Sequence, residues 1–134
     1  IINSRGGSVT AGLALIDTMQ SLDCPVITVG EGVVASMAAV ILACGDHRQV
    51  YRHTQVLIHQ LMGGTGMAQQ TDIEIVAQHT AAMRAELDEL LAEHGNLSAQ
   101  EFHELTERDC WCNAKRALEL GLVDEVIAPS KKAL

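Results

Sequence analysis

The sequence predicts an α/β fold and a single domain over residues 1–134. Short apolar stretches with strand character alternate along the chain with segments whose apolar residues recur at helical spacing. That alternation is typical of helices packed against a sheet. Hydrophobic residues make up 48% of the chain, enough for one core at this length, and no linker or internal repeat divides it.

The first half of the chain contains most of the predicted strands. Apolar residues recur every three or four positions in 9–22, which predicts an amphipathic helix. Residues 32–45 are small and apolar on every side, a pattern typical of a fully buried helix. In chain order we expect a strand end at 1–2, a glycine turn at 3–7, the first helix, a strand at 26–30, the buried helix, and strands at 49–51 and 55–58.

A long helix dominates the second half of the chain. Residues 70–94 show helical periodicity after a glycine-rich loop at 63–66, and they would span about 37 Å at 1.5 Å per residue. Because this helix has only one broad apolar stripe, we expect it to project from the body and pack on a neighbour. The remaining expected elements are a helix opened by a Ser98–Glu101 capping box, a short helix capped by Asn113 that ends at Gly121, and a strand at 122–127.

The composition argues against several classes of protein. With Lys+Arg 9 against Asp+Glu 17 and 2% aromatic residues, the chain lacks the basic patch and stacking surface that nucleic-acid binding needs. Its longest apolar run, 37–44, is far shorter than the roughly 20 residues of a membrane span. The histidines form no metal-binding motif, and Cys110-x-Cys112 lacks the spacing of a zinc or redox site. We therefore expect reduced thiols, a cytoplasmic setting, and neither nucleic acid, membrane nor metal as a partner.

Three polar residues are candidates for nucleophilic catalysis. Ser36 lies between a predicted strand and an apolar helix, where free backbone N–H groups could stabilise an oxyanion; helix capping is the alternative role. His59 ends an apolar strand and could take a proton from a serine, although an ordinary hydrogen-bonded histidine fits as well. Asp109 could orient that histidine or be a solvated surface charge. Spacing alone leaves these alternatives open, because geometry defines a triad.

Several short motifs follow one another in a characteristic order. They are INSRGGSVTAG at 2–12, DTMQ at 17–20, ASM at 35–37, LIHQ at 57–60, GG at 63–64, TDIEI at 71–75, ELLAEH at 89–94, RD at 108–109 and ALELGLVD at 117–124. In this order, over essentially the whole chain, they resemble the proteolytic subunit of the ATP-dependent Clp protease, the ClpP family. The resemblance implies a ClpP/crotonase-like fold of stacked strand-strand-helix units with a protruding handle at about 60–95.

The resemblance also implies a role for each candidate residue. Ser36 matches the family's nucleophile, His59 its general base and Asp109 the residue that orients the histidine. The backbone N–H groups of Gly7 and Met37 match the oxyanion hole. This agrees with the residues themselves, since a glycine turn and the residue after a helix-start serine can both present an N–H group.

Binding and assembly roles follow from the same resemblance. Gly6 and Val9 match a segment that pairs with an extended substrate as an added strand. Glu107 and Arg108 match a pair that bridges two rings, although an exposed ion pair is the simpler interpretation. Family members form heptameric rings, stacked in pairs, and a partner AAA+ unfoldase ATPase feeds them unfolded polypeptide. ATP is used by that partner, so we expect no cofactor in this chain, which has no phosphate-binding loop of its own.

Three positions depart from the family pattern. Arg5 and Leu61 stand where proline is usual, and proline restrains a turn; Ala38 stands where glycine is usual. The chain begins at Ile1 in what resembles a strand end, so we expect the family's N-terminal portion, with its axial loops, to be missing.

The resemblance implies a serine endopeptidase that cuts unfolded polypeptides into short peptides by Ser/His/Asp acyl-enzyme hydrolysis. A non-catalytic ring subunit with an intact but misaligned triad is the alternative, motivated by Arg5 and Leu61. A crotonase-like acyl-CoA enzyme is a third possibility. A membrane-associated relative with a serine–lysine dyad is a fourth, disfavoured because the lysines all lie near the C-terminus, at Lys115, Lys131 and Lys132.

Overall fold

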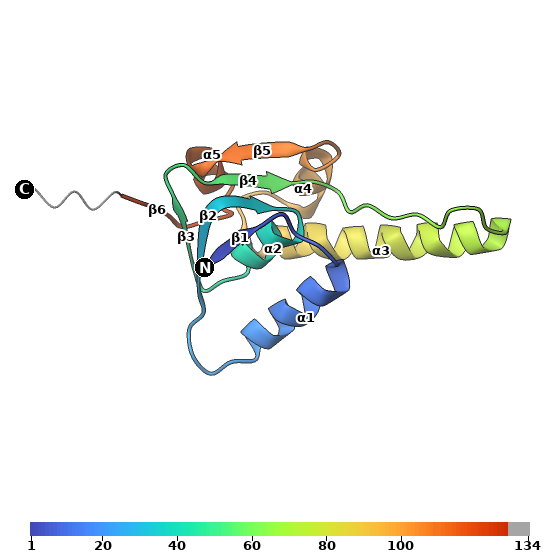
Figure 1. The fold of residues 1–134 in the computed structure, drawn as a ribbon, viewed down its shortest axis with the longest axis horizontal. Coiled ribbons are helices and arrows are strands. Elements are labelled where there is room, and N and C mark those ends of the chain that lie inside the picture. The colour runs from blue at the N-terminus through green and yellow to red at the C-terminus, as the bar shows by residue number, and fades with distance from the viewer. Residues whose placement is uncertain (129–134) are drawn as a thin grey trace, which may run out of the picture.

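The computed structural model describes residues 1–128, which fold around a six-stranded sheet (Figure 1). Its strands in chain order are β1 (Ile2–Ser4), β2 (Ile27–Ala35), β3 (His47–Tyr51), β4 (Gln55–Ile58), β5 (Cys110–Asn113) and β6 (Glu125–Ile127). β2 pairs in parallel with β1, β3 and β4, β6 pairs in parallel with β3, and β5 pairs antiparallel with β4. The predicted α/β class is confirmed.

Besides β1, strand β2 pairs with two other strands, one at each of its ends. Residues 27–30 pair with β3, whereas residues 33–35 pair with β4. Between these two stretches Gly32 adopts φ +64°, a left-handed conformation that glycine takes without strain. The last residues of β2 are thereby directed along β4, and the serine that follows β2 is carried to the end of β4.

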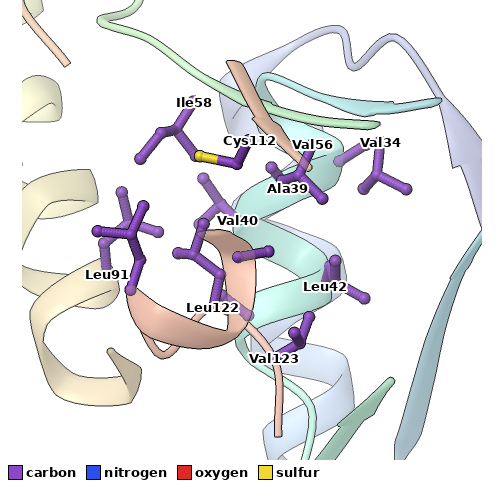
Figure 2. Close-up of a cluster of buried hydrophobic side chains, with 14 of the residues drawn as sticks. Val34, Ala39, Val40, Leu42, Val56, Ile58, Leu91, Cys112, Leu122 and Val123 are labelled. Atoms are coloured by element: carbon purple, nitrogen blue, oxygen red, sulfur yellow. The ribbon is translucent and has the colours of Figure 1, made fainter. Parts of the chain in front are cut away.

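The core lies where α2 packs against the sheet. Side chains from α2, β2, β4, β5, α3 and the segment before β6 converge there (Figure 2). Six of the seven residues of α2 are buried, which agrees with the all-apolar pattern of its sequence. The helices are α1 (Val9–Gln20), α2 (Met37–Ala43), α3 (Gln70–His94), α4 (Ala99–Leu105) and α5 (Ala114–Glu119).

Two predicted boundaries are wrong by three residues or more, and the others differ by two residues at most. Residues 32–35 were expected to begin the buried helix, but they form the end of β2, and the helix starts only at Met37. A short apolar run fits a buried strand as well as a buried helix, so periodicity could not separate them. The last strand begins at Glu125 and not at residue 122, because Leu122 bonds instead to the carbonyl of Ala117 at the end of α5.

Helix α3 has the predicted bounds and projects from the body, as expected (Figure 1). Asp88 and Leu91, toward its C-terminal end, are its buried residues. The predicted capping box is confirmed, since Ser98 accepts a bond from the Glu101 backbone and the Glu101 side chain bonds back to the Ser98 backbone. Asn113 caps α5 as predicted. The packing of α3 on a neighbour stays a prediction.

Within residues 1–128, none of the helices is both long and apolar enough to span a lipid bilayer. Of the three lysines weighed above, Lys115 lies in α5, and Lys131 and Lys132 lie outside the described residues.

Candidate active site

The three candidate residues lie at the same edge of the sheet. Ser36 directly follows β2 and His59 directly follows β4, and these two strands are parallel neighbours. Asp109 directly precedes β5, which runs antiparallel to β4 with Ile58 opposite Cys110. The end of β4 and the start of β5 are therefore adjacent, and the pairing brings together residues that are far apart in the sequence.

Ser36 has a backbone conformation that suits a nucleophile better than a helix cap. Its φ of +59° and ψ of −130° make it the one non-glycine residue at positive φ among residues 1–128. Such a conformation costs about 1–3 kcal/mol and occurs mainly where function requires it. Ser36 occupies the N-cap position of α2, yet its side chain makes no capping hydrogen bond. Its backbone N–H donates to the carbonyl of Leu57 at 2.8 Å, which fixes the serine against the end of β4.

A glycine loop packs directly on this serine. Gly6 adopts φ +89°, and a Cβ placed there would lie 2.6 Å from the carbonyl oxygen of Ala35 and 2.7 Å from the Cβ of Ser36. The position therefore requires glycine, both for its backbone angle and for the close approach. A Cβ at the next residue, Gly7, would contact nothing within 4 Å.

The two N–H groups proposed from the sequence are both available. In the part of the chain that the structure describes, neither the Gly7 nor the Met37 backbone N–H donates a hydrogen bond. Met37 is the first residue of α2, where an N–H group has no partner within the helix. Free backbone donors beside a nucleophile can stabilise the oxyanion of a tetrahedral intermediate.

The histidine lies near both of its expected partners without bonding to either. His59 Nδ1 is 3.9 Å from Asp109 Oδ1, which is longer than a hydrogen bond. No hydrogen bond joins Ser36 to His59 among the bonds of residues 1–128. The His59 side chain is only 15% exposed, whereas that of Asp109 is 66% exposed. Catalytic hydrogen bonds are commonly long without substrate and shorten in the reacting complex.

Ser36 and His59 open into one cleft of about 270 Å³. Gly7, Val9 and Met37 also line it, and its other apolar walls are Val40, Ile58, Leu61, Met62, Leu87 and Leu91. Gly6, expected to bind substrate with Val9, lies instead in a neighbouring hollow beside β1 and α1. The structure thus brings the candidate nucleophile, the candidate base and both candidate N–H donors to one cleft.

Two charged residues of the cleft wall were missed by the sequence reasoning. Arg84 and Asp88 of α3 both line the cleft. Asp88 is buried, and its Oδ2 lies 2.7 Å from Nδ1 of His103. The sequence did carry a signal for this pair. Arg84 and Asp88 are oppositely charged and four residues apart, and Asp88 lies next to Leu87 and one turn before Leu91. A pair beside these apolar residues fits a position facing the protein as well as one facing solvent.

Glu107 and Arg108, the residues expected to bridge two rings, differ from each other in their contacts within this chain. Glu107 Oε2 bonds to Nη2 of Arg84 at 3.0 Å. Arg108, within residues 1–128, makes no hydrogen bond or ion pair. Both residues line an outer hollow together with His59 and Asp109. Their contact with another ring stays a prediction.

The buried thiol of Cys112, in β5, is unsuited to act as a nucleophile. Burial first, and then the thiol of Cys110 at 3.7 Å, raises the pKa of Cys112 to about 12, so that thiol stays protonated at neutral pH. All four cysteines are free. Residues 1–128 contain no group of three or more His, Cys, Asp or Glu side chains arranged to hold a metal ion.

Nearly the whole chain is similar to one protein family. The family model described as Clp protease matches residues 1–130. The chain is 42% identical over 129 residues to the ATP-dependent Clp protease proteolytic subunit of Lactococcus lactis subsp. cremoris (strain SK11), covering 94% of this chain and 65% of the relative. It is also 42% identical over 132 residues to the subunit of the same name from Streptococcus sanguinis (strain SK36), covering 96% and 67%.

The chain thus spans about 65% of the length of the Lactococcus relative. Its curled mixed sheet with flanking helices and a projecting α3 agrees with the ClpP/crotonase fold. The sequence match and the architecture lead to the same conclusion: this chain belongs to the Clp protease family.

Proposed function

We propose that this chain is a serine endopeptidase subunit. The observation that carries the proposal is the strained Ser36 at the junction of β2 and α2, opening into a cleft that it shares with His59. Backbone strain of this kind clusters at functional sites, and at Ser36 no capping hydrogen bond explains it. Family membership supports the same assignment.

The residues suit acyl transfer through a covalent intermediate. Ser36 Oγ attacks the scissile carbonyl carbon while His59 accepts its proton, and the Gly7 and Met37 N–H groups stabilise the oxyanion. Collapse of that intermediate breaks the C–N bond, and His59 gives the proton to the leaving amine. Water, deprotonated by His59, then hydrolyses the ester and regenerates the serine. Asp109 holds the imidazole in the required tautomer and stabilises the imidazolium.

The substrate class and the assembly are part of the proposal. The relatives are named as proteolytic subunits of an ATP-dependent protease, which supports unfolded polypeptide as substrate and an AAA+ unfoldase as the partner that uses ATP. Substrate would pair with the Gly6–Val9 segment as an added strand. One domain with a handle at 60–95 would assemble into two stacked heptameric rings in the cytoplasm. The exposed apolar side chains of the handle support packing on a second copy, namely Met62, Met67, Ile73 and Ile75.

The alternative, a non-catalytic ring subunit, is favoured by one observation. His59 Nδ1 is 3.9 Å from Asp109 Oδ1, and Leu61, in the loop that carries the histidine, offers no proline-like restraint. If assembly does not shorten that distance, the chain would hold a ring together without cleaving peptides.

Labelling with a fluorophosphonate distinguishes the two functions. The assembled protein, its oligomeric state verified by light scattering, should gain one adduct by intact mass, and Ser36→Ala should gain none. Ser21→Ala is the matched control, because Ser21 directly follows α1 and its side chain donates only to the carbonyl of Thr18. An adduct retained in Ser36→Ala would contradict the assigned nucleophile. Assembled wild type without any adduct would establish the non-catalytic alternative.

A further inference from the structure

One arginine of α3 joins the two loops that carry the base and its orienting carboxylate. Arg84 Nη1 donates to the side-chain oxygen of Gln60 at 2.9 Å. Arg84 Nη2 donates to the carboxylate of Glu107 and to the carbonyl of His103, each at 3.0 Å. The Arg84 side chain is only 17% exposed. These acceptors come from two segments more than forty residues apart, so one guanidinium bridges them.

The two loops are also bonded to each other next to the catalytic residues. Gln60 directly follows His59, and its backbone N–H donates to the carbonyl of Thr106 at 2.9 Å. The Gln60 side-chain amide donates to the carbonyl of Glu107, also at 2.9 Å. Glu107 is two residues before Asp109. Gln60 therefore connects the histidine loop (residues 59–66) to the aspartate loop (residues 106–109). Arg84 in turn donates a hydrogen bond to the side-chain oxygen of Gln60.

The histidine loop has little restraint from its own sequence. Residues 59–66 contain three glycines, whose backbone angles are free to vary, and no proline. Charge-assisted bonds are stronger than neutral ones, and the planar guanidinium can serve two or three acceptors in fixed directions. A lysine at the same place would have one compact charge and no such geometry.

We propose that Arg84 is a positioning residue, which sets the approach of His59 to Asp109 by fastening both loops to α3. The inference rests on the proposed function and adds a residue to it. Arg84 also makes those loops follow α3, so a displacement of that helix would change the 3.9 Å separation between histidine and carboxylate.

The test measures the rate of fluorophosphonate acylation per active site as a function of pH. The charged groups around His59 are Asp109, Glu107 and Arg108 of the aspartate loop, with Arg84 and Asp88 on α3. In Arg84→Met the carboxylate of Asp109 no longer stays beside the ring, so the acidic limb of the rate profile should shift to lower pH. The maximal rate should fall about 10- to 100-fold, the effect expected of a displacement near 1 Å.

Three further variants make the result specific. Arg84→Lys should restore part of the rate, because one ammonium replaces some of the lost bonds. Gln60→Leu should shift the acidic limb in the same direction. Because Gln60 is partly exposed to solvent, this variant should fold even if Arg84→Met does not. Arg116→Met is the matched control, because Arg116 forms only a surface pair with Glu119 at 3.3 Å, and it should leave the profile unchanged.

The outcomes separate this inference from the proposed function. Wild type that is never acylated would refute the protease assignment itself. Acylated wild type together with Arg84→Met and Gln60→Leu profiles that are merely scaled down, with the acidic limb unmoved, would show that Arg84 only supports folding, and the inference would be overturned.

Discussion

Replacing Gly6 with alanine tests whether the glycine loop supplies part of the oxyanion hole. The residue has φ +89°, and an alanine Cβ would lie 2.6 Å from the carbonyl oxygen of Ala35, 2.7 Å from Ser36 Cβ and 3.0 Å from the Met37 nitrogen. Gly64, an exposed loop residue outside the cleft, provides a matched control, since a Cβ there also meets nothing within 4 Å. Comparing Gly6→Ala with Gly64→Ala separates the crowding beside Ser36 from the mere replacement of a glycine by alanine.

The expected effect follows from these contacts. Positive φ at a non-glycine residue costs about 1–3 kcal/mol. Real Cβ atoms essentially never approach within 3.0 Å of another heavy atom, so the loop must also retreat by a few tenths of an ångström. Both Gly6 and Gly7 are exposed, so the loop can move, and we expect a total stability loss of about 2 kcal/mol. The Gly7 N–H moves with the loop, and loss of one oxyanion donor lowers kcat about 10²- to 10³-fold.

Steady-state cleavage of a short fluorogenic peptide, with acylation rates and thermal unfolding in parallel, provides the measurement. Gly6→Ala should lose kcat with folding and assembly retained, whereas Gly64→Ala should resemble wild type in all three assays. A Gly6→Ala protein with undiminished kcat would refute the reasoning, because the loop would then have no role at the reacting carbonyl. Equal losses of kcat in both variants would show that replacing a glycine as such lowers activity, and that crowding beside Ser36 is not the cause.

Two further predictions concern groups away from the cleft. Hydrogen bonds from Arg48 hold the pKa of Asp124 below its usual range, so the stabilisation is complete above about pH 4 and is lost as pH falls through the lowered folded-state pKa. Asp124→Asn should therefore lose about 2 kcal/mol at neutral pH and less in acid by urea unfolding, and a pH-independent difference would contradict this. Burial raises the pKa of Cys44 to about 11 and that of Cys112 to about 12, while Cys24 is exposed. Maleimide labelling followed by mass spectrometry should therefore modify Cys24 first, and equal rates for Cys44 would show that the core opens.

Features with a local cause were predictable from the sequence. The bounds of α3 are correct because helical periodicity continues from Gln70 to His94 and a glycine follows. The caps at Ser98 and Asn113 are correct because each bond joins residues three apart. The boundary after Gly32 was not, because whether an apolar run is strand or helix depends on a partner strand elsewhere in the chain.

The candidate site shows the same division. The sequence determined by itself the α/β class and, through ordered motifs, which serine, histidine and aspartate to examine. Only the tertiary structure decided that the ends of β2 and β4 and the start of β5 meet, that Ser36 is strained, and that Arg84 ties the two loops together. Sheet pairing and side-chain bridges join segments far apart in the chain, so their geometry depends on packing, which no local pattern encodes.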